Sequence, residues 1–316
     1  MNILLTAIGS MSALCIIHKL HKAGCKVIGC DIYPKSWHYE ASQCDVFAQA
    51  PYANTKEYIP FLLNLAIDND VRYIFPLTDV EIDIINENRY VFKQAGIVIC
   101  FSSRKTLSVV RNKLALYDFF KEDKKVLSIP TYTYKDDLSK LMFPCVAKPI
   151  KGRSSEGLHY LRNRVQLKAI ESLTSYVFQP KIEGQICTVD FVRDVKSDSE
   201  FCVPREELLR TKNGAGITVR IFHNEKLEAL VDYIGYKLNI QGVINMEFIV
   251  SSNNYYLLDI NPRFSAGIAF SCNMGYDFII AHLNCFRSEK IPSPIAFSFC
   301  VVIAVLIFVN SICISL

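Results

Sequence analysis

The sequence predicts an α/β protein that opens with a doubly wound parallel sheet and continues with an α+β module of two subdomains. Short apolar strands alternate with segments of helical spacing over about the first hundred residues, which is typical of a parallel sheet covered by helices. Strand–loop–strand segments follow after Ser102, and two strands that carry carboxylates come near the end. The length of 316 residues leaves room for two or three domains.

The first part of the chain alternates its elements in a regular order. The expected strands cover residues 2–6, 26–31, 73–76 and 97–101, and the expected helices cover residues 11–23 and 57–68. Parallel sheets bind ligands at the carboxyl ends of their strands. The residues at those ends are Gly9, Ser10, Asp31, Thr78 and Asp79. An NAD site would need two more glycines beside Gly9, so Gly9 and Asp31 are interpreted as turn residues of the scaffold.

Composition limits the classes of function. Hydrophobic residues make up 51% and charged residues 21% of the chain, so it is globular rather than disordered. The net charge of +4 is not concentrated in a basic stripe, so no nucleic-acid partner is expected. The twelve cysteines form no CxxC pair, and no basic region precedes the apolar start of the chain. A reduced, cytoplasmic protein with buried thiols is therefore expected.

A glycine- and serine-containing loop follows a strand that ends in a lysine. The strand covers residues 143–149 and includes Lys148. The loop residues of interest are Lys151, Gly152, Ser154, Ser155 and Gly157. Such a loop can fold over an anion, because backbone N–H groups and small hydroxyls satisfy phosphate oxygens. It is not a P-loop, since GxxxxGK[ST] is missing, and a solvated surface turn is the competing interpretation.

The next apolar strand starts at Tyr176 and leads into a short linker made of Gln179, Pro180, Lys181 and Ile182. Its backbone groups could read the edge of a purine. Proline cannot continue a ladder in the middle of a sheet, which suits a hinge or an edge.

Two consecutive apolar strands near the end carry carboxylates. Asp259, Asn261 and Arg263 alternate along the second strand, so they share one face. Glu247 lies on the first strand, and the polar turn 251–254 predicts a hairpin that sets Glu247 beside Asp259. Carboxylate and amide oxygens suit Mg²⁺, which usually shares them with substrate phosphates, and arginine grips phosphate. Two adjacent carboxylates repel each other, so a cation between them is expected.

A basic segment lies between the linker and this hairpin. Arg205, Arg210 and Lys212 are interspersed with acids and are candidates for binding a substrate carboxylate. Gly214 and Gly216 allow a close approach of the backbone. The competing interpretation is a solvated loop with weak local ion pairs.

In this order the segments resemble the ATP-grasp superfamily, in particular its carbamoyl-phosphate-synthase-like and biotin-carboxylase-like carboxylate–amine ligases. The resemblance covers about residues 1–290, and Asp-Ile-Asn-Pro-Arg at 259–263 is its most specific piece, although the family usually has Glu in place of Asp259. It implies a pre-ATP-grasp domain followed by an ATP-grasp module. The expected domains are residues 1–101, 102–175 with the loop, 176–290 with the metal and substrate site, and the tail 291–316.

The resemblance also implies cofactors and roles for residues. ATP and Mg²⁺ are the expected cofactors, with Mn²⁺ as an alternative metal. The metal ligands would be Glu247, Asp259 and Asn261, and the catalytic residues would be Lys148 and Arg263. The ATP-binding residues would be Lys113, Lys148, Lys151, Gly152, Ser154, Ser155, Gly157, Gln179, Pro180, Lys181 and Ile182. The family's ribose-binding glutamate is missing from the window that follows Gly184, and Glu183 or Asp190 could replace it.

The implied activity is that of a ligase in which ATP converts a carboxylate to an acyl phosphate, and an amine or ammonia then attacks. The expected partners are small-molecule carboxylate and amine substrates, and a homodimer is compatible with the resemblance. The alternative is a non-catalytic ATP-binding or regulatory protein with an incomplete acceptor site. The missing ribose acid and the unusual tail favour that alternative.

The tail, residues 291–316, contains no charged residue, and residues 295–316 are nearly all apolar. This run is long enough to span a bilayer. Three interpretations stay open: a membrane anchor, a buried terminal segment, or an atypical ending of the fold. The cytoplasm is the expected location, and membrane association through residues 295–316 is the alternative.

Overall fold

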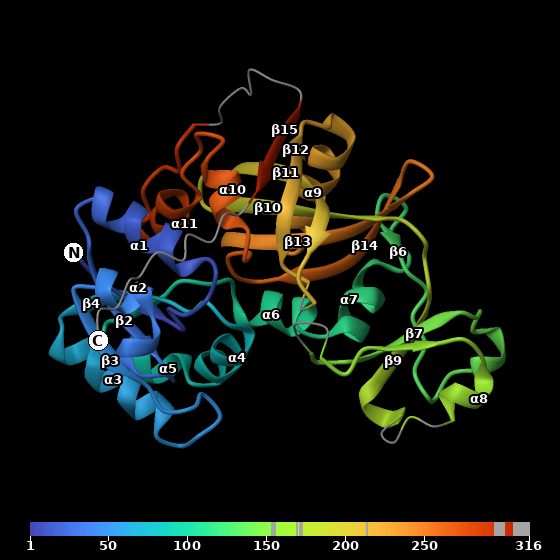
Figure 1. Ribbon diagram of the computed structural model, residues 1–316, viewed down its shortest axis with the longest axis horizontal. Coiled ribbons are helices and arrows are strands. Elements are labelled where there is room, and N and C mark those ends of the chain that lie inside the picture. Colours follow the sequence, from blue (N-terminus) through green and yellow to red (C-terminus); the bar gives the residue numbers. More distant parts are fainter. Residues whose placement is uncertain (153–155, 169, 171–172, 213, 294–300, 306–316) are drawn as a thin grey trace, which may run out of the picture.

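The computed structural model describes residues 1–152, 156–168, 170, 173–212, 214–293 and 301–305 of the chain. These residues form three sheets (Figure 1). A five-stranded parallel sheet lies in the N-terminal part, a seven-stranded sheet forms the largest body, and a three-stranded sheet stands apart from both.

The N-terminal sheet has the strand order β3-β2-β1-β4-β5, and all of its pairings are parallel. Its strands are β1 (Asn2–Thr6), β2 (Lys26–Asp31), β3 (Val46–Gln49), β4 (Val71–Phe75) and β5 (Val98–Ile99). The expected doubly wound sheet is confirmed. The sequence did not predict β3, because this edge strand is only half-buried and its apolar run is just three residues long. The last expected strand, 97–101, is shorter than predicted.

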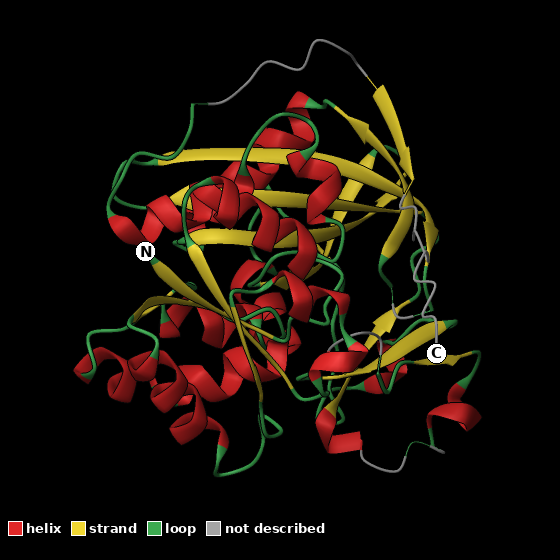
Figure 2. Cartoon of the chain, turned by 60° about the vertical axis from the view of Figure 1, so that its left-hand side comes forward, coloured by secondary structure: helices red, strands yellow, loops and turns green. Residues whose placement is uncertain are grey.

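Helices cover both faces of this sheet (Figure 2). Leu4 and Ile74 pack against the helices of one face, whereas Ile3 and Val27 pack against those of the other. The first face is covered by α3 (Tyr58–Asp68), α4 (Asp79–Glu87) and α5 (Arg89–Gln94), and the second by α1 (Ala13–Lys22) and α2 (Tyr39–Gln43). Burial on both faces explains why these strands read as apolar runs.

The apolar spacing of residues 106–120 predicts a single helix, and this prediction is wrong. The chain forms α6 (Arg104–Val110) and α7 (Lys113–Phe120), and Asn112 breaks them with an extended backbone. The side chain of Asn112 accepts hydrogen bonds from the N–H groups of Leu114 and Ala115, both at 3.0 Å. This cap places Lys113 at the first residue of α7.

The seven-stranded sheet has the order β15-β12-β11-β10-β13-β14-β6 and is antiparallel except between β14 and β6. Its strands are β6 (Leu127–Ser128), β10 (Gln185–Asp194), β11 (Ser199–Arg210), β12 (Gly216–Phe222), β13 (Gly242–Ser251), β14 (Asn254–Asn261) and β15 (Val301–Val305). Helices α9 (Glu225–Lys237), α10 (Ile268–Cys272) and α11 (Phe278–Arg287) pack on this sheet.

The predicted hairpin is present in this sheet as β13 and β14. Glu247 pairs with Asp259, and Asn245 pairs with Asn261. Ser252 and the next residue of the turn both have positive φ, 48° and 61°. Two such residues make a turn whose twist matches the flanking strands, which sets the register of the hairpin.

The small sheet has the order β8-β7-β9 and confirms the expected strand–loop–strand segment. Its strands are β7 (Cys145–Pro149), β8 (His159–Leu161) and β9 (Tyr176–Pro180), and the short helix α8 (Arg164–Leu167) packs beside them. Leu141, Leu161, Leu167 and Phe178 belong to its separate hydrophobic core. Ser154 and the following serine lie outside the described residues.

Part of the apolar tail joins the large sheet. Val301–Val305 forms β15 and pairs antiparallel with β12. No helix within the described parts of the chain is long and apolar enough to cross a membrane. The domain divisions after residues 101, 175 and 290 stay a prediction.

Candidate functional site

A cavity of about 520 Å³ lies between the large sheet and the small sheet. Most of the site residues predicted from sequence line it: Lys113, Lys148, Gly152, Gln179, Pro180, Lys181, Ile182, Arg205, Arg210, Glu247, Asp259, Asn261 and Arg263. Lys151, Gly157 and Lys212 are described but are not part of the lining. Residues from segments far apart in the sequence therefore meet around one space.

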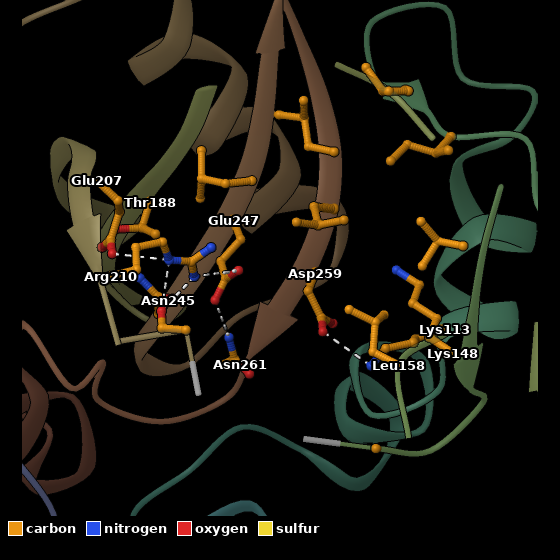
Figure 3. A pocket seen from close by; sticks show the side chains of 18 of the residues that line it. Lys113, Lys148, Leu158, Thr188, Glu207, Arg210, Asn245, Glu247, Asp259 and Asn261 are labelled. Carbon is orange, nitrogen blue, oxygen red and sulfur yellow. Dashed lines mark hydrogen bonds and ion pairs between the residues drawn. The ribbon is translucent and has the colours of Figure 1, made fainter. Parts of the chain in front are cut away.

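The two carboxylates of the hairpin face this cavity (Figure 3). The side chains of Glu247 and Asp259 are 22% and 25% exposed. The side-chain amide of Asn261 donates a hydrogen bond to Glu247 Oε1 at 3.4 Å. Burial raises the pKa of Glu247, although Arg210 acts in the opposite direction. The predicted oxygen-rich face therefore exists.

Each carboxylate already faces a protein cation. Arg210 Nη2 lies 3.6 Å from Glu247 Oε2, and Lys113 Nζ lies 3.1 Å from Asp259 Oδ2. Figure 3 shows Arg210 on one side of the hairpin and the lysines on the other. The repulsion expected between the carboxylates is thus offset within the protein itself.

The donor set fits Mg²⁺. No three His, Cys, Asp or Glu side chains within the described residues are grouped to hold a metal. The hairpin instead offers two carboxylates and one amide oxygen, from Glu247, Asp259 and Asn261. These are fewer protein ligands than would enclose a metal ion completely. Mg²⁺ is usually held by one or two carboxylates, with water and substrate phosphates completing the octahedron.

Lys148, near the end of β7, is a buried cation that lines the cavity. Its exposed fraction is 6%, and no ion pair to it is found in the described parts of the chain. Burial lowers the pKa of Lys148 to about 8, and the nearby charge of Lys113 acts in the same direction. A buried lysine beside a cavity favours an anionic ligand. The negative charge of the ligand compensates for the hydration that the ammonium group has lost.

The end of β9 and the linker that follows it line the cavity, but several of their polar groups already have partners. The side-chain amide of Gln179 donates to Thr131 Oγ1 at 2.7 Å, and the backbone N–H of Lys181 donates to the carbonyl of Pro144 at 2.9 Å. The Lys181 amine pairs with Glu183 at 2.5 Å. A purine at this position would therefore have to use other backbone groups of the linker.

The predicted basic segment divides into three different environments. Arg210 lines the cavity, whereas Lys212 is exposed and lies outside the lining. Arg205 is 1% exposed and forms a buried ion pair with Asp190, and it also donates to Ser271 Oγ at 2.6 Å. Arg205 is better suited to hold the wall of the cavity than to meet a substrate directly, and its substrate-binding role stays a prediction.

Glu207 was missed by sequence reasoning. It is 5% exposed, lines the cavity and accepts a hydrogen bond from Thr188 Oγ1 at 3.0 Å. Arg210 Nε lies 3.4 Å from its other oxygen. A Cβ on Gly216 would approach that oxygen to 2.4 Å, so the glycine makes room for the carboxylate. Its position could have been predicted from Arg205. Glu207 lies two residues further along β11, and residues two apart in a strand point to the same face.

Arg263 lies just beyond β14 and is 19% exposed. Its guanidinium lines the cavity and donates from Nε and Nη2 to Asp79 Oδ2, at 3.1 and 2.9 Å. Asp79 begins α4, so an ion pair joins the N-terminal part to the residue just beyond the β13–β14 hairpin.

Two family models and several solved structures match this chain. Residues 3–100 match the PylC-like N-terminal domain, and residues 110–267 match the ATP-grasp domain. Rhizobium etli pyruvate carboxylase superposes with a TM-score of 0.77 at 16% identity, over 93% of this chain and 29% of that enzyme. This chain therefore spans less than a third of that enzyme.

Two smaller structures are similar over most of their length. The biotin carboxylase domain of Hydrogenobacter thermophilus 2-oxoglutarate carboxylase, in complex with MgADP, ADP and bicarbonate, has a TM-score of 0.76 at 15% identity, over 92% of this chain and 70% of that one. Thermotoga maritima N5-carboxyaminoimidazole ribonucleotide synthetase has a TM-score of 0.67 at 18% identity, over 92% and 77%. These likenesses concern the fold. With the family match over residues 110–267, they lead to one assignment: this chain belongs to the ATP-grasp family.

Proposed function

We propose that this protein is an ATP- and Mg²⁺-dependent ligase that activates a carboxylate as an acyl phosphate for attack by an amine or ammonia. The arrangement that carries the proposal is the pairing of Glu247 with Asp259, opposite the buried Lys148, in one cavity of an ATP-grasp chain. Negative oxygens for a metal and positive groups for phosphates meet there at close range.

The nucleotide would lie between the two sheets. Lys113, Lys148 and Gly152 would meet its phosphates, and the linker 179–182 would meet its base. When bound, Mg²⁺ would be held by Glu247 and its hairpin partners, and it would neutralise the charge of the phosphates.

The reaction would proceed in two displacements. A carboxylate oxygen attacks the γ-phosphorus of ATP, and ADP leaves as the acyl phosphate forms. The amine nitrogen then attacks the acyl carbon, inorganic phosphate leaves, and the nitrogen loses a proton. Lys148 and Arg263 would stabilise the charge on the transferred phosphoryl group, and Arg210 would orient the carboxylate. No nucleophile from the protein is required.

The structural relatives support this proposal at the level of chemistry. One of them was crystallised with MgADP and bicarbonate, which pairs a nucleotide and its metal with a small oxyanion. The same classes of ligand match the charges of the cavity. Small-molecule substrates and a cytoplasmic location are part of the proposal, and a homodimer stays a prediction.

Phosphate release tests the proposed function. The full chain is incubated with ATP, Mg²⁺ and pools of carboxylates and amines. We expect release that depends on one pool, that is lost in Asp259→Ala, and that persists in the control Asp118→Ala, which changes an exposed acid outside the cavity. Tight binding of ATP without turnover in any pool would instead indicate a regulatory ATP-binding protein. A wild-type chain that binds no ATP would overturn the assignment.

A further inference from the structure

Asp79 contacts the cavity-lining Arg263 from outside the ATP-grasp domain. It is the first residue of α4, within residues 3–100. The start of this helix is rigidly defined, because Thr78 and Glu81 form a capping box in which Glu81 Oε2 accepts from the backbone N–H of Thr78 at 3.3 Å and from its hydroxyl at 2.7 Å. The position of the Asp79 carboxylate is therefore set by the N-terminal part of the chain.

The carboxylate of Asp79 is enclosed by two guanidinium groups. It is 2% exposed. Oδ2 accepts from Arg263 Nε and Nη2, and Oδ1 lies 3.1 Å from Arg111 Nη1. Burial alone would raise the pKa of Asp79, but the charges of Arg263 and Arg111 outweigh burial and hold the pKa below its usual value. Asp79 is thus an ionised, fixed acceptor.

These contacts determine how Arg263 faces the cavity. Nη1 of Arg263 also donates to the carbonyl of Phe264 at 3.2 Å. A guanidinium has five N–H donors. Within the described part of the chain, Asp79 and Phe264 use three of these donors, which leaves two for a ligand. Arg263 lines the cavity, whereas Asp79 is not part of the lining.

We propose that Asp79 is a positioning residue that orients Arg263 toward the transferred phosphoryl group without touching the nucleotide. This inference rests on the proposed function, because it assumes that Arg263 meets the γ-phosphate of ATP. The inference means that the N-terminal part contributes to catalysis through Arg263. An arginine held at two of its donors keeps the remaining donors aimed at one place, which supports in-line transfer.

A purely structural ion pair is the competing explanation, and the chain offers a matched control for it. Asp83 lies one turn further along α4 and pairs with Arg111 through Nε at 3.0 Å and Nη2 at 2.8 Å. Asp83 does not contact Arg263 in the described structure. Asp83→Asn therefore removes a neighbouring carboxylate of the same network and leaves the Asp79–Arg263 contact in place.

The test compares two nucleotides that differ in the γ-phosphate. Calorimetry measures the binding of MgADP and of the Mg²⁺ complex of the non-hydrolysable β,γ-imido analogue of ATP. We expect Asp79→Asn to weaken the imido analogue at least fivefold and to change ADP affinity less than twofold. Asp83→Asn should change neither, and Asp79→Asn should add nothing further in an Arg263→Lys background.

Three outcomes would overturn the inference while the proposed function stands. They are equal losses of affinity for both nucleotides, equal effects of Asp79→Asn and Asp83→Asn, and no effect of Asp79→Asn. A wild-type chain that binds neither nucleotide would overturn both. Should Asp79→Asn fail to fold, Asp79→Glu tests the same point. Glutamate keeps the charge but carries its carboxylate one methylene further out, so the contact to Arg263 is displaced and the same selective loss is expected.

Discussion

At the scale of single residues, the cavity is built from groups that are costly to bury. Lys148 is almost fully buried beside the cavity, and Glu207 is buried where Gly216 makes room for it. Charged groups lose hydration when they are buried, and only a close partner offsets the free energy that this loss costs. Such residues are therefore the ones whose substitution or titration has the clearest consequences.

The lowered pKa of Lys148 leads us to expect that nucleotide binding depends on pH. Its pKa of about 8 means that the amine is protonated below pH 8 and becomes neutral above it. Because phosphate binding needs the charged form, the Kd for MgATP should rise about eightfold from pH 7.5 to pH 9, as expected for one proton. Titration calorimetry across this range measures it. Lys148→Gln should bind more weakly at every pH and lose the dependence; a wild-type Kd that stays constant contradicts this account.

Gly216→Ala should destabilise the protein through Glu207. The added methyl would lie 2.4 Å from the Glu207 carboxylate, so the carboxylate or β12 must move, at a cost of about 1–3 kcal/mol in free energy of unfolding. Denaturant unfolding measures the loss. In a Glu207→Ala background the same change should cost much less, because the clash partner is gone. Equal costs in both backgrounds would show that Glu207 is not the cause.

At the scale of elements, the site depends on where helices and strands begin and end. Lys113 faces Asp259 because Asn112 ends one helix and caps the next. Glu247 faces Asp259 because the turn at Ser252 sets the hairpin register. A slip of one residue would turn a whole strand face away from the cavity.

Asn112→Ala should lower both stability and nucleotide affinity. Loss of the cap costs about 1 kcal/mol in free energy of unfolding, and it frees the start of α7, where Lys113 lies. Thermal unfolding and calorimetry with MgATP measure the two effects. Asn224→Ala is the control, since Asn224 caps α9 through the N–H of Leu227 at 2.9 Å, away from the cavity lining. It should reduce stability similarly and leave affinity unchanged; a loss of affinity in both variants would contradict a local role for the cap.

At the scale of the whole molecule, two of the three hydrophobic cores join the N-terminal and large sheets. Leu4 and Phe248 belong to one cluster, and Ile3 and Val243 belong to another. The small sheet has its own core, which includes Cys145, Ala147 and Phe178. Few buried residues hold it, so it should be the least stable unit of the fold.

Native-state hydrogen exchange should separate these units. Amides of β10 and β13 should exchange only through global unfolding, whereas those of β7 and β9 should exchange at a lower free energy of opening. Addition of MgATP should raise the protection of amides in β7, since Lys148 lies there and a ligand that binds the folded state stabilises it. Equal opening free energies for β7 and β10 would contradict this division, because the small sheet would then unfold together with the large sheet.

Much of this protein follows from its sequence alone. Period-two alternation and a polar turn are local signals, so they set Glu247 beside Asp259 and place Asn261 on the same face. Apolar strands between amphipathic helices likewise specified the parallel sheet. The bounds of β1 and β2 match the predicted ones because burial on both faces leaves little room for ambiguity.

Only the tertiary structure decided the partners of the charged groups. The bond between Asp79 and Arg263 joins residues 184 positions apart, and the ion pair of Arg205 with Asp190 depends on the pairing of two strands. Burial by other segments lowers the pKa of Lys148, and Lys113 acts in the same direction, whereas Asp259 and Glu247 oppose the shift. Burial and long-range electrostatics arise from packing between elements, and no local pattern encodes them. The sequence therefore determined which strands could carry a phosphate site, and the fold determined which of its charges are free to act there.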